Sequence, residues 1–410
     1  MKKEEVKNLI SQIYEEGEGI FRLAPAWVPR VFSLPGKRLK LSTGDLYILG
    51  SNRGGIDERW LASVTVADNG PGTPPDEGLS YIVFNNKRMI TLREAIQVGG
   101  DFILGEKIMQ KYGGWKILTK FFDNMGPLPL HLHQDDKQAK LVNREGKPEA
   151  YYFPPELNFI ENNFPHTYFG LEPGTKKEDI KKCLKNWHRG DSSILSYSRA
   201  YRIKPGTGWF IPPRILHAPG SLVTYEVQWA SDVASMFQPI TAEGINIPWD
   251  LLVKDIPQEK HQDIDYIVNL IDWPKNTDEY FKSHHYLEPI TASGEKGVYK
   301  EKWIIYGTND LFSAKELTVF PGKEIRIKEN GAYGLVVIQG YGNIERFPVE
   351  SPTTIRYGDL TYDELFVCFE AARRGILIKN RGKENLVILK CFGPATNPDM
   401  PPIETYSKRE

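Results

Sequence analysis

The chain has 410 residues, with 52 Lys and Arg against 53 Asp and Glu, so its formal net charge at pH 7 is -1. Such a balance gives no indication of a nucleic-acid partner or of a membrane surface, since both favour clustered basic residues. At roughly 100–200 residues per domain, the length predicts two or three units.

The start of the chain and its cysteines bear on the compartment. Residues 1–10 are charged and lack an apolar core followed by a small-residue cleavage site, so no secretory signal is predicted. No stretch is long and apolar enough to span a bilayer. Cys183, Cys368 and Cys391 are far apart and have no CxxC spacing, so neither a disulfide framework nor a thiolate zinc site is indicated. A reducing cytoplasm is therefore expected.

Short β-type runs separated by Gly and Pro turns occur along most of the chain, and this spacing predicts a mostly β fold. Two helices interrupt the runs. Thr91-Leu-Arg-Glu94 and Thr175-Lys-Lys-Glu178 both carry the Thr-x-x-Glu pattern of a capping box, and both precede amphipathic segments. Residues 241–300 are richer in charge, Pro and helix-like patterns, so they are predicted to connect two β units.

These patterns divide the chain into three parts. Residues 1–240 are expected to form an N-terminal segment and a first β domain with helical insertions. Residues 241–300 form a partly helical connection, and residues 301–410 form a second β domain. The second domain contains no histidine, so it is not expected to repeat any metal chemistry of the first.

His131 and His133 are the most informative pair of residues, because positions i and i+2 of a strand point to the same side. If Glu149 and His217 come from neighbouring strands, the four side chains make a three-histidine, one-carboxylate metal site with room for water or substrate. Such a set suits zinc, iron, manganese, nickel or cobalt better than calcium or magnesium, which prefer oxygen ligands.

Each of these residues alone has a plainer explanation. His131 and His133 could be partly exposed strand residues, Glu149 a solvated loop charge, and His217 a hydrogen-bonded core histidine. The apolar neighbours of His133 and His217 favour the metal site, because an unpaired polar ring buried among Leu, Pro and Ile costs roughly a few kcal/mol.

Four motifs in fixed order resemble the pattern of the type I phosphomannose isomerases of the cupin superfamily. They are His131-Leu-His133-Gln-Asp-Asp136, Gly146-Lys-Pro-Glu149, Ile211-Pro-Pro-Arg-Ile-Leu-His217-Ala218 and Tyr225-Glu226-Val-Gln-Trp-Ala-Ser-Asp232. Segments 55–60, 115–123 and 167–170 extend the resemblance over roughly residues 35–240, and the second domain is covered only loosely. The resemblance implies a mostly β bicupin fold with helical insertions, whose second cupin domain is degenerate and lacks metal ligands.

The resemblance also implies a metal-dependent aldose-ketose isomerase. In that family one metal, usually zinc, holds the substrate while a proton moves between C1 and C2 through an enediol, which converts mannose 6-phosphate to fructose 6-phosphate. Carried over to this chain, the ligands of one divalent metal, zinc first, would be His131, His133, Glu149 and His217. Glu226 would be the base, and Lys147 and Lys120 would bind substrate oxygens or stabilise negative charge.

Two residues depart from the family's pattern. His131 stands where the family has a glutamine ligand, which moves the site toward the three-histidine, one-glutamate set of cupins with many other activities. Met236, ten residues past Glu226, stands where the family carries an arginine that serves the substrate. Three arginines could take its place from other strands: Arg199, Arg202 and Arg214.

These departures leave three functions open. The first is an isomerase of a sugar phosphate, mannose 6-phosphate foremost, and the second is an isomerase or epimerase of an unphosphorylated sugar or sugar acid, which Met236 favours. The third is a cupin oxygenase or a sugar-binding regulator. The motifs around Lys147 and Glu226 favour the isomerases, since a generic cupin does not need them. The expected partner is a small sugar or sugar phosphate, without nucleic acid or membrane, and a homodimer stays open.

Overall fold

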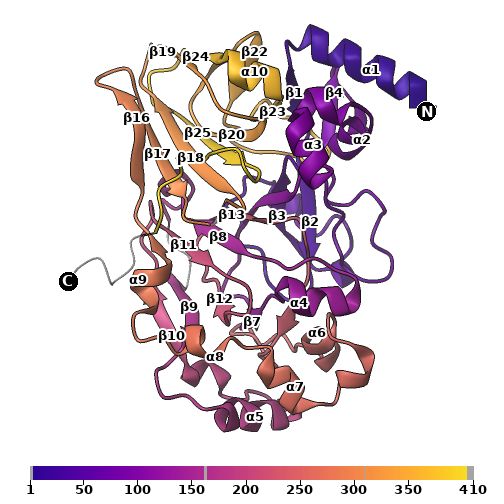
Figure 1. The fold of residues 1–410 in the computed structure, drawn as a ribbon, viewed down its shortest axis with the longest axis vertical. Coiled ribbons are helices and arrows are strands. Elements are labelled where there is room, and N and C mark those ends of the chain that lie inside the picture. Colours follow the sequence, from indigo (N-terminus) through magenta and orange to yellow (C-terminus); the bar gives the residue numbers. More distant parts are fainter. Residues whose placement is uncertain (1–2, 161–163, 309, 404–410) are drawn as a thin grey trace.

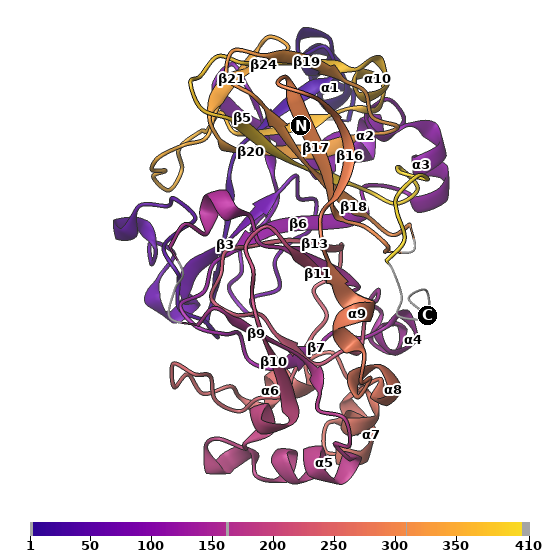
Figure 2. The same cartoon turned by 90° about the vertical axis from the view of Figure 1, so that its left-hand side faces the viewer.

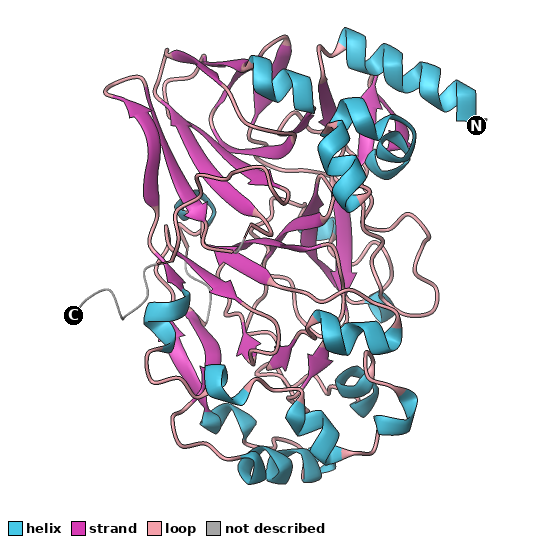
Figure 3. Ribbon diagram, viewed as in Figure 1, coloured by secondary structure: helices cyan, strands magenta, loops and turns pink. Residues whose placement is uncertain are grey.

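The computed structural model describes residues 3–160, 164–308 and 310–403 (Figure 1). Strands run through the body of the molecule, and helices lie mainly at its two ends (Figure 3). The strands form four antiparallel sheets, and within the described residues none of the sheets closes on itself. The predicted mostly β fold is confirmed, whereas the assignment of two cupin units stays a prediction.

The first pair of sheets lies in the lower half of Figure 1 and holds the residues singled out above. Its seven-stranded sheet has, in order, β15 (Tyr286–Leu287), β11 (Gly208–Ile211), β8 (Glu149–Tyr152), β13 (Thr224–Trp229), β6 (Ile117–Phe122), β3 (Gly55–Leu61) and β2 (Ala26–Arg30). Its five-stranded sheet has β10 (Ser198–Arg202), β9 (His166–Leu171), β12 (His217–Ala218), β7 (His131–Leu132) and β14 (Ser235–Met236). Figure 2 shows the five-stranded sheet below the seven-stranded one.

The second pair of sheets lies in the upper half of Figure 1. Its nine-stranded sheet has β16 (Ile290–Glu295), β17 (Tyr299–Ile305), β18 (Ser313–Val319), β25 (Leu386–Phe392), β20 (Tyr333–Gln339), β23 (Glu364–Val367), β1 (Ile20–Leu23), β4 (Tyr81–Phe84) and β5 (Lys87–Thr91). Its four-stranded sheet has β19 (Glu324–Ile327), β24 (Ile376–Asn380), β21 (Tyr341–Ile344) and β22 (Phe347–Glu350). Strand β1 thus pairs with β23 near the end of the chain and joins β4 and β5 to this sheet, and the boundaries at residues 240 and 300 stay predictions.

The seven-stranded sheet uses its two faces differently. Because side chains alternate along a strand, Tyr225 and Val227 of β13 point away from Glu226 between them. Tyr225 and Val227 belong to the largest apolar cluster, which also contains Trp303 of β17 and Phe366 of β23. One face of the sheet therefore packs against the nine-stranded sheet, and the other face carries the buried polar side chains of the candidate site.

The helices cover the ends of the two sheet pairs. The upper helices are α1 (Lys3–Glu16), α2 (Leu92–Leu104), α3 (Glu106–Tyr112) and α10 (Phe369–Arg374). The lower helices are α4 (Asp136–Ala139), α5 (Lys177–Lys185), α6 (Trp249–Val253), α7 (Ile264–Asn269), α8 (Trp273–Asn276) and α9 (Phe281–His285). Four of them fall within residues 241–300, as the helix-like patterns there predicted. Among the described residues, no helix has the length and apolar character needed to cross a membrane.

Only one of the two predicted capping boxes forms. The Thr91 hydroxyl accepts from the backbone N–H of Glu94 (3.1 Å), and the Glu94 carboxylate accepts from the backbone N–H of Thr91 (2.9 Å). The box at Thr175 is wrong, because α5 begins at Lys177 and the carboxylate of Asp179 accepts from the backbone N–H of Lys176 (2.9 Å). The helix starts one position later than the pattern indicates, since Asp179 reaches the free N–H group instead of Glu178.

Thr91 and Thr175 form a matched pair for a stability test. Replacing Thr91 with Ala removes the N-cap acceptor of α2, so we expect the free energy of unfolding to fall by about 1 kcal/mol. Replacing Thr175 with Ala removes only a hydroxyl that bonds the carbonyl of Glu172, so the change is expected to stay within about 0.5 kcal/mol. Urea denaturation of the three proteins measures both values, and equal losses would contradict the assignment of the caps.

Candidate metal centre

Three histidines come together on the five-stranded sheet. His131 of β7 lies directly opposite His217 of the neighbouring β12, and His133 follows two residues after His131. One ring nitrogen from each histidine lies within 4.8 Å of those of the other two. The rings of His131 and His133 do come together, although β7 ends at Leu132 and His133 lies one residue beyond the strand, and His217 comes from an adjacent strand.

Glu149 reaches this group from the opposite sheet. It begins β8 of the seven-stranded sheet, so the expectation that it comes from a strand beside the histidines is wrong. Its carboxylate oxygens lie 3.0 Å from Nε2 of His133 and 2.9 Å from Nε2 of His217. All four side chains are at most 5% exposed. The candidate ligands are therefore held between two sheets rather than along one.

The outer ring nitrogen of each histidine is fixed by a backbone carbonyl. Nδ1 lies 2.7 Å from the carbonyl of Pro129 in His131, 2.7 Å from that of Val233 in His133, and 2.8 Å from that of Ile215 in His217. A carbonyl can only accept, so Nδ1 carries the proton in all three rings. This arrangement orients metal-binding imidazoles, and it leaves the lone pair of each Nε2 directed inward.

Burial keeps the rings of His131 and His133 neutral. Desolvation lowers the pKa of His133 to about 4 and the pKa of His131 well below its ordinary value. Glu149 stays ionised although burial opposes this, because the ammonium of Lys147, 3.2 Å away, is foremost among the charges that hold its pKa well below the usual range. Near neutral pH His131 and His133 are therefore neutral imidazoles beside one carboxylate.

This donor set fits a divalent transition metal. His133 and His217 present Nε2 lone pairs to the Glu149 carboxylate at 2.9–3.0 Å, and two acceptors at that distance repel one another unless a cation stands between them. Both nitrogens are buried and lack a hydrogen-bond partner among the described residues. Three imidazoles and a carboxylate suit zinc and the other metals named above, and the residues themselves do not select one.

A row of alternating charges continues from the metal centre across the seven-stranded sheet. Glu226 of β13 lies opposite Lys120 of β6, with Nζ of Lys120 3.5 Å and Nζ of Lys147 3.6 Å from its carboxylate. Lys120 also lies 3.3 Å from Glu58 of β3. Glu58 in turn accepts from the guanidinium of Arg30 at 3.1 and 3.2 Å. Neighbouring strands thus contribute acid and base in turn, which balances the charge buried on this face.

Two glutamates of this row differ in their pKa. Burial raises the pKa of Glu226 to about 7, because the attraction of Lys120 only partly offsets desolvation and the charge of Glu149 adds to it. Burial acts on Glu58 as well, but Arg30 and Lys120 lower its pKa to about 2. One oxygen of Glu226 also has no hydrogen-bond partner among the described residues. Glu226 is therefore the carboxylate of the row that can exchange a proton near neutral pH.

The centre and the row of charges lie in the wall of a cavity of about 510 Å³. The predicted site residues that line it are His131, His133, Glu149, Glu226, Lys147 and Lys120. Met236 also lines it and lies opposite His131 in the pairing of β14 with β7. A cavity of this size is typical of small-molecule sites.

The three arginines expected to replace a charge at Met236 do not line this cavity. Arg199 donates to the carbonyls of Asn276 and Asp278, and Arg214 donates to the carbonyl of Leu270 at 2.8 Å. Arg202 is an exposed residue of β10. The expectation that one of these arginines supplies the charge missing at Met236 is therefore wrong, since none of the three side chains lines the cavity.

Several residues of the cavity wall were not predicted. Arg30 and Lys254 line it, as does Asp232, whose carboxylate lies 3.6 Å from Arg30. Tyr151, which also lines the cavity, donates its hydroxyl to Glu149. Asp232 ends one of the four ordered motifs, and Tyr151 follows Glu149 by the same i, i+2 spacing that placed the histidines, so both could have been found from the sequence. Arg30 and Lys254 offered no such pattern.

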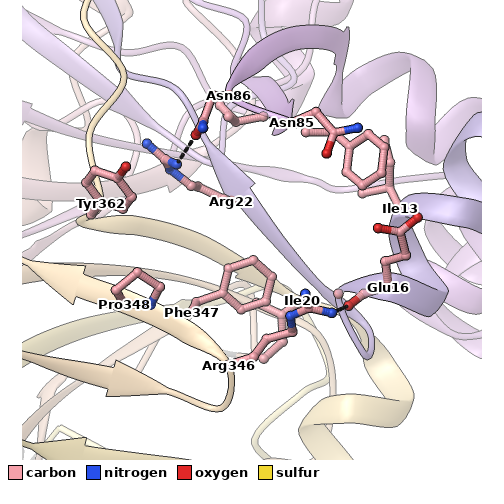
Figure 4. Close-up of a pocket in the computed structure, with 13 residues that line it drawn as sticks. Ile13, Glu16, Ile20, Arg22, Asn85, Asn86, Arg346, Phe347, Pro348 and Tyr362 are labelled. Carbon is pink, nitrogen blue, oxygen red and sulfur yellow. Dashed lines mark hydrogen bonds between the residues drawn. The ribbon is translucent and has the colours of Figure 1, made fainter.

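A second, smaller cavity of about 210 Å³ lies among α1, β1, the β4–β5 turn and the β21–β22 hairpin (Figure 4). The figure shows Arg22 beside Asn86 and Arg346 beside Glu16 at opposite sides of this space. None of the described residues that line it is a histidine, a cysteine or an aspartate. It therefore offers no second metal centre.

Comparison of the fold with solved structures finds mannose-6-phosphate isomerases. The enzyme from Bacillus subtilis matches with a TM-score of 0.60 and 17% identity, over 91% of this chain and 99% of that one. A variant of phosphomannose isomerase from Salmonella typhimurium matches at 0.58 and 13%, over 92% and 100%. A zinc-bound mannose 6-phosphate isomerase gives the same values. The chain thus has the fold of these isomerases over nearly its whole length.

Sequence comparison adds nothing to this finding. No family model matches the chain, and no curated protein matches its sequence. The structural neighbours bear out the resemblance at the level of the fold. Identities of 13–17% do not carry the activity with them.

Metal analysis tests the centre directly. We expect the dialysed protein to retain about one divalent metal ion per chain, and we expect Glu149→Ala and His217→Ala each to lose it, because each removes a ligand from a small set. His188, an exposed histidine outside the site, provides the matched control as His188→Ala. Inductively coupled plasma mass spectrometry gives the metal content, and circular dichroism checks that each variant folds. Metal retained in both ligand variants would contradict the assignment.

Proposed function

We propose that this protein is a metal-dependent aldose-ketose isomerase of a sugar. The observation that carries the proposal is a buried carboxylate with a pKa near 7, Glu226, which lies between two lysines and lines the same cavity as a metal-binding set of side chains. Moving a proton between two carbons of a sugar requires a base of this kind beside a group that stabilises negative charge on oxygen. The structural neighbours, by name mannose 6-phosphate isomerases, support the same class of reaction.

In this proposal His131, His133, Glu149 and His217 hold the metal. The bound metal supplies polarisation of a sugar oxygen, which lowers the free energy of the enediolate. Glu226 removes the proton from C2 of the aldose and returns it to C1, while the hydroxyl proton moves from O2 to O1. The free oxygen of Glu226 and its pKa near 7 suit both steps, because the group must accept and release the proton at similar free energy.

Lys120 and Lys147 stabilise the negative charge that develops on the sugar oxygens. Both ammonium groups are buried, at 6% and 5% exposure, and both lie within 3.6 Å of Glu226. Charged donors that are fixed before the reaction need no reorganisation when charge appears on the substrate. Burial also strengthens their effect, since water does not screen them.

The oxygenase and the regulator are the less favoured candidates. The four candidate ligands are compatible with iron and dioxygen, but neither function needs a glutamate of raised pKa between two lysines. Oxygen uptake by the iron-loaded protein would support the oxygenase, and sugar affinity without turnover would support the regulator.

An isomerase assay decides between these functions. Protein loaded with zinc, manganese or cobalt is incubated with aldoses and with their 6-phosphates, mannose 6-phosphate first because the structural neighbours carry its name. We expect interconversion of one aldose and its ketose, with loss of activity after chelation and recovery on addition of metal. If metal-loaded protein interconverted no sugar and no sugar phosphate, the proposed function would be wrong.

Replacing Glu226 with Gln removes the base and keeps the shape of the side chain. We expect kcat to fall by about 10²–10⁴-fold while bound metal is retained, because Glu226 is not a ligand. A surface carboxylate, Glu145, gives the control Glu145→Gln with unchanged kcat. An isomerase with full activity in Glu226→Gln would contradict the role of this residue.

The pKa of Glu226 also predicts the pH dependence. The base works only when ionised, so kcat/KM of the wild type should fall about tenfold per pH unit below the pKa. That limb is expected at or below pH 7, since a cation bound beside Glu149 lowers the pKa of Glu226. A pH profile measures it, and a rate independent of pH from 5 to 8 would contradict proton transfer through this carboxylate.

A further inference from the structure

The cations in the wall of the main cavity are all engaged. Each of the five lysines and arginines that line it within the described residues lies within 4.0 Å of a carboxylate. The pairs are Arg30 with Glu58 and Asp232, Arg53 with Glu77, Lys120 with Glu58 and Glu226, Lys147 with Glu149 and Glu226, and Lys254 with Asp68. In the described part of the chain each lining cation thus already has a carboxylate partner, which a permanently anionic ligand would have to displace or share.

Arg30 illustrates how fully these groups are used. Its guanidinium donates two hydrogen bonds to Glu58 and a third to the side-chain oxygen of Asn69, at 2.9 Å. Arg30 and Glu58 are both about 5% exposed, so neither charge can turn to solvent instead. A phosphate that took the guanidinium would leave the Glu58 carboxylate buried with one cation fewer, which is unfavourable.

The balance of charge in the cavity also disfavours a phosphorylated ligand. The described lining contains six carboxylates against the five cations, and it contains no serine or threonine hydroxyl. These charges give the lining a net charge of one negative, and a divalent metal at the centre would change it only to one positive. A phosphate group commonly needs arginine or lysine free to form charge-assisted hydrogen bonds, often with hydroxyls or a helix N-terminus.

The remaining lining suits an uncharged, hydroxyl-rich ligand. Asn52 and Asp250 present polar groups, while Phe32 and Met236 present apolar surface. Met236 is 7% exposed and lies opposite His131, so an apolar side chain stands beside the metal centre. Sugars have hydroxyl edges and apolar faces, and such a wall can contact both.

We propose that the substrate is a neutral sugar without a phosphate group, and that Met236 contributes to this choice. The proposal rests on the isomerase function proposed above and narrows its substrate class. The structural neighbours are named for a phosphorylated sugar, and the paired cations of this cavity are what separate the present chain from that substrate.

Binding of sugar alcohols tests the inference without turnover, since an alditol has no carbonyl and cannot be isomerised. Isothermal titration calorimetry of the metal-loaded protein compares sorbitol with sorbitol 6-phosphate, and mannitol with its phosphate. We expect the neutral member of at least one pair to bind as tightly as its phosphate or more tightly, with little effect of added salt, because screening acts on charges. Salt-sensitive binding in which the phosphate was about tenfold tighter in both pairs would overturn the inference.

Met236→Arg tests the role of that position. An arginine there would be a cavity cation without a carboxylate partner, and one charged hydrogen bond should strengthen binding of the phosphorylated alditol by about tenfold. Met236→Leu, a volume-conserving change, is the control and should keep the wild-type preference. Thermal denaturation and metal content show whether each variant folds. If Met236→Arg does not fold, the calorimetric comparison of neutral and phosphorylated alditols on the wild type decides whether the inference holds. A folded Met236→Arg without gain for the phosphate would contradict the role of Met236.

The turnover panel separates this inference from the proposed function. Isomerisation of a free sugar with little activity on its phosphate supports both. Isomerisation of phosphates alone keeps the isomerase and overturns the neutral substrate. Binding of a neutral alditol without turnover of any sugar keeps the ligand class and overturns the isomerase. Absence of both binding and turnover overturns both.

Discussion

Repulsion between buried acceptor atoms dominates the candidate metal centre. His133 and His217 direct Nε2 lone pairs at the carboxylate of Glu149 across 2.9–3.0 Å. Their Nδ1 protons are already given to backbone carbonyls, so the rings cannot turn to donate without losing those bonds. Only a cation resolves such an arrangement at low cost. The arrangement can therefore hold a divalent metal ion.

The two sheets can hold this arrangement because each face of the seven-stranded sheet is buried for a different reason. Its outer face joins the apolar cluster shared with the nine-stranded sheet, through residues such as Tyr225 and Val227. That packing fixes the strands in register, so Glu226 and Lys120 meet directly opposite one another on the inner face. Buried charges are tolerated there because acid and base alternate across neighbouring strands. The apolar packing on one face thus stabilises the sheet whose other face carries the buried polar side chains.

The sequence predicted what depends on spacing and failed on what depends on packing between distant segments. The i, i+2 pair and the order of the motifs located the histidines, Glu149 and Glu226, and the β character followed from short runs and turns. The pairing of β1 with β23 could not be read from local pattern, nor could the origin of Glu149 on the opposite sheet. Arg30 was missed because its partner, Glu58, is 28 residues away. The capping box at Thr175 failed because the carboxylate of Asp179 accepts from the backbone N–H of Lys176, so the helix begins one residue later than the pattern indicates.

The charge row also explains why a single base stands out. Glu58 and Glu226 are equally buried and share Lys120, yet their pKa values differ, about 2 against about 7. Glu58 has a bidentate guanidinium in addition, whereas Glu226 has a second ammonium at 3.6 Å and the negative charge of Glu149 nearby. A planar guanidinium fork stabilises a carboxylate more than a distant ammonium does. Arg30 keeps Glu58 ionised, and because its guanidinium is bound to Glu58 it is not free to bind a ligand. The base and the neutral-substrate cavity that we propose are in this way two results of one distribution of charge.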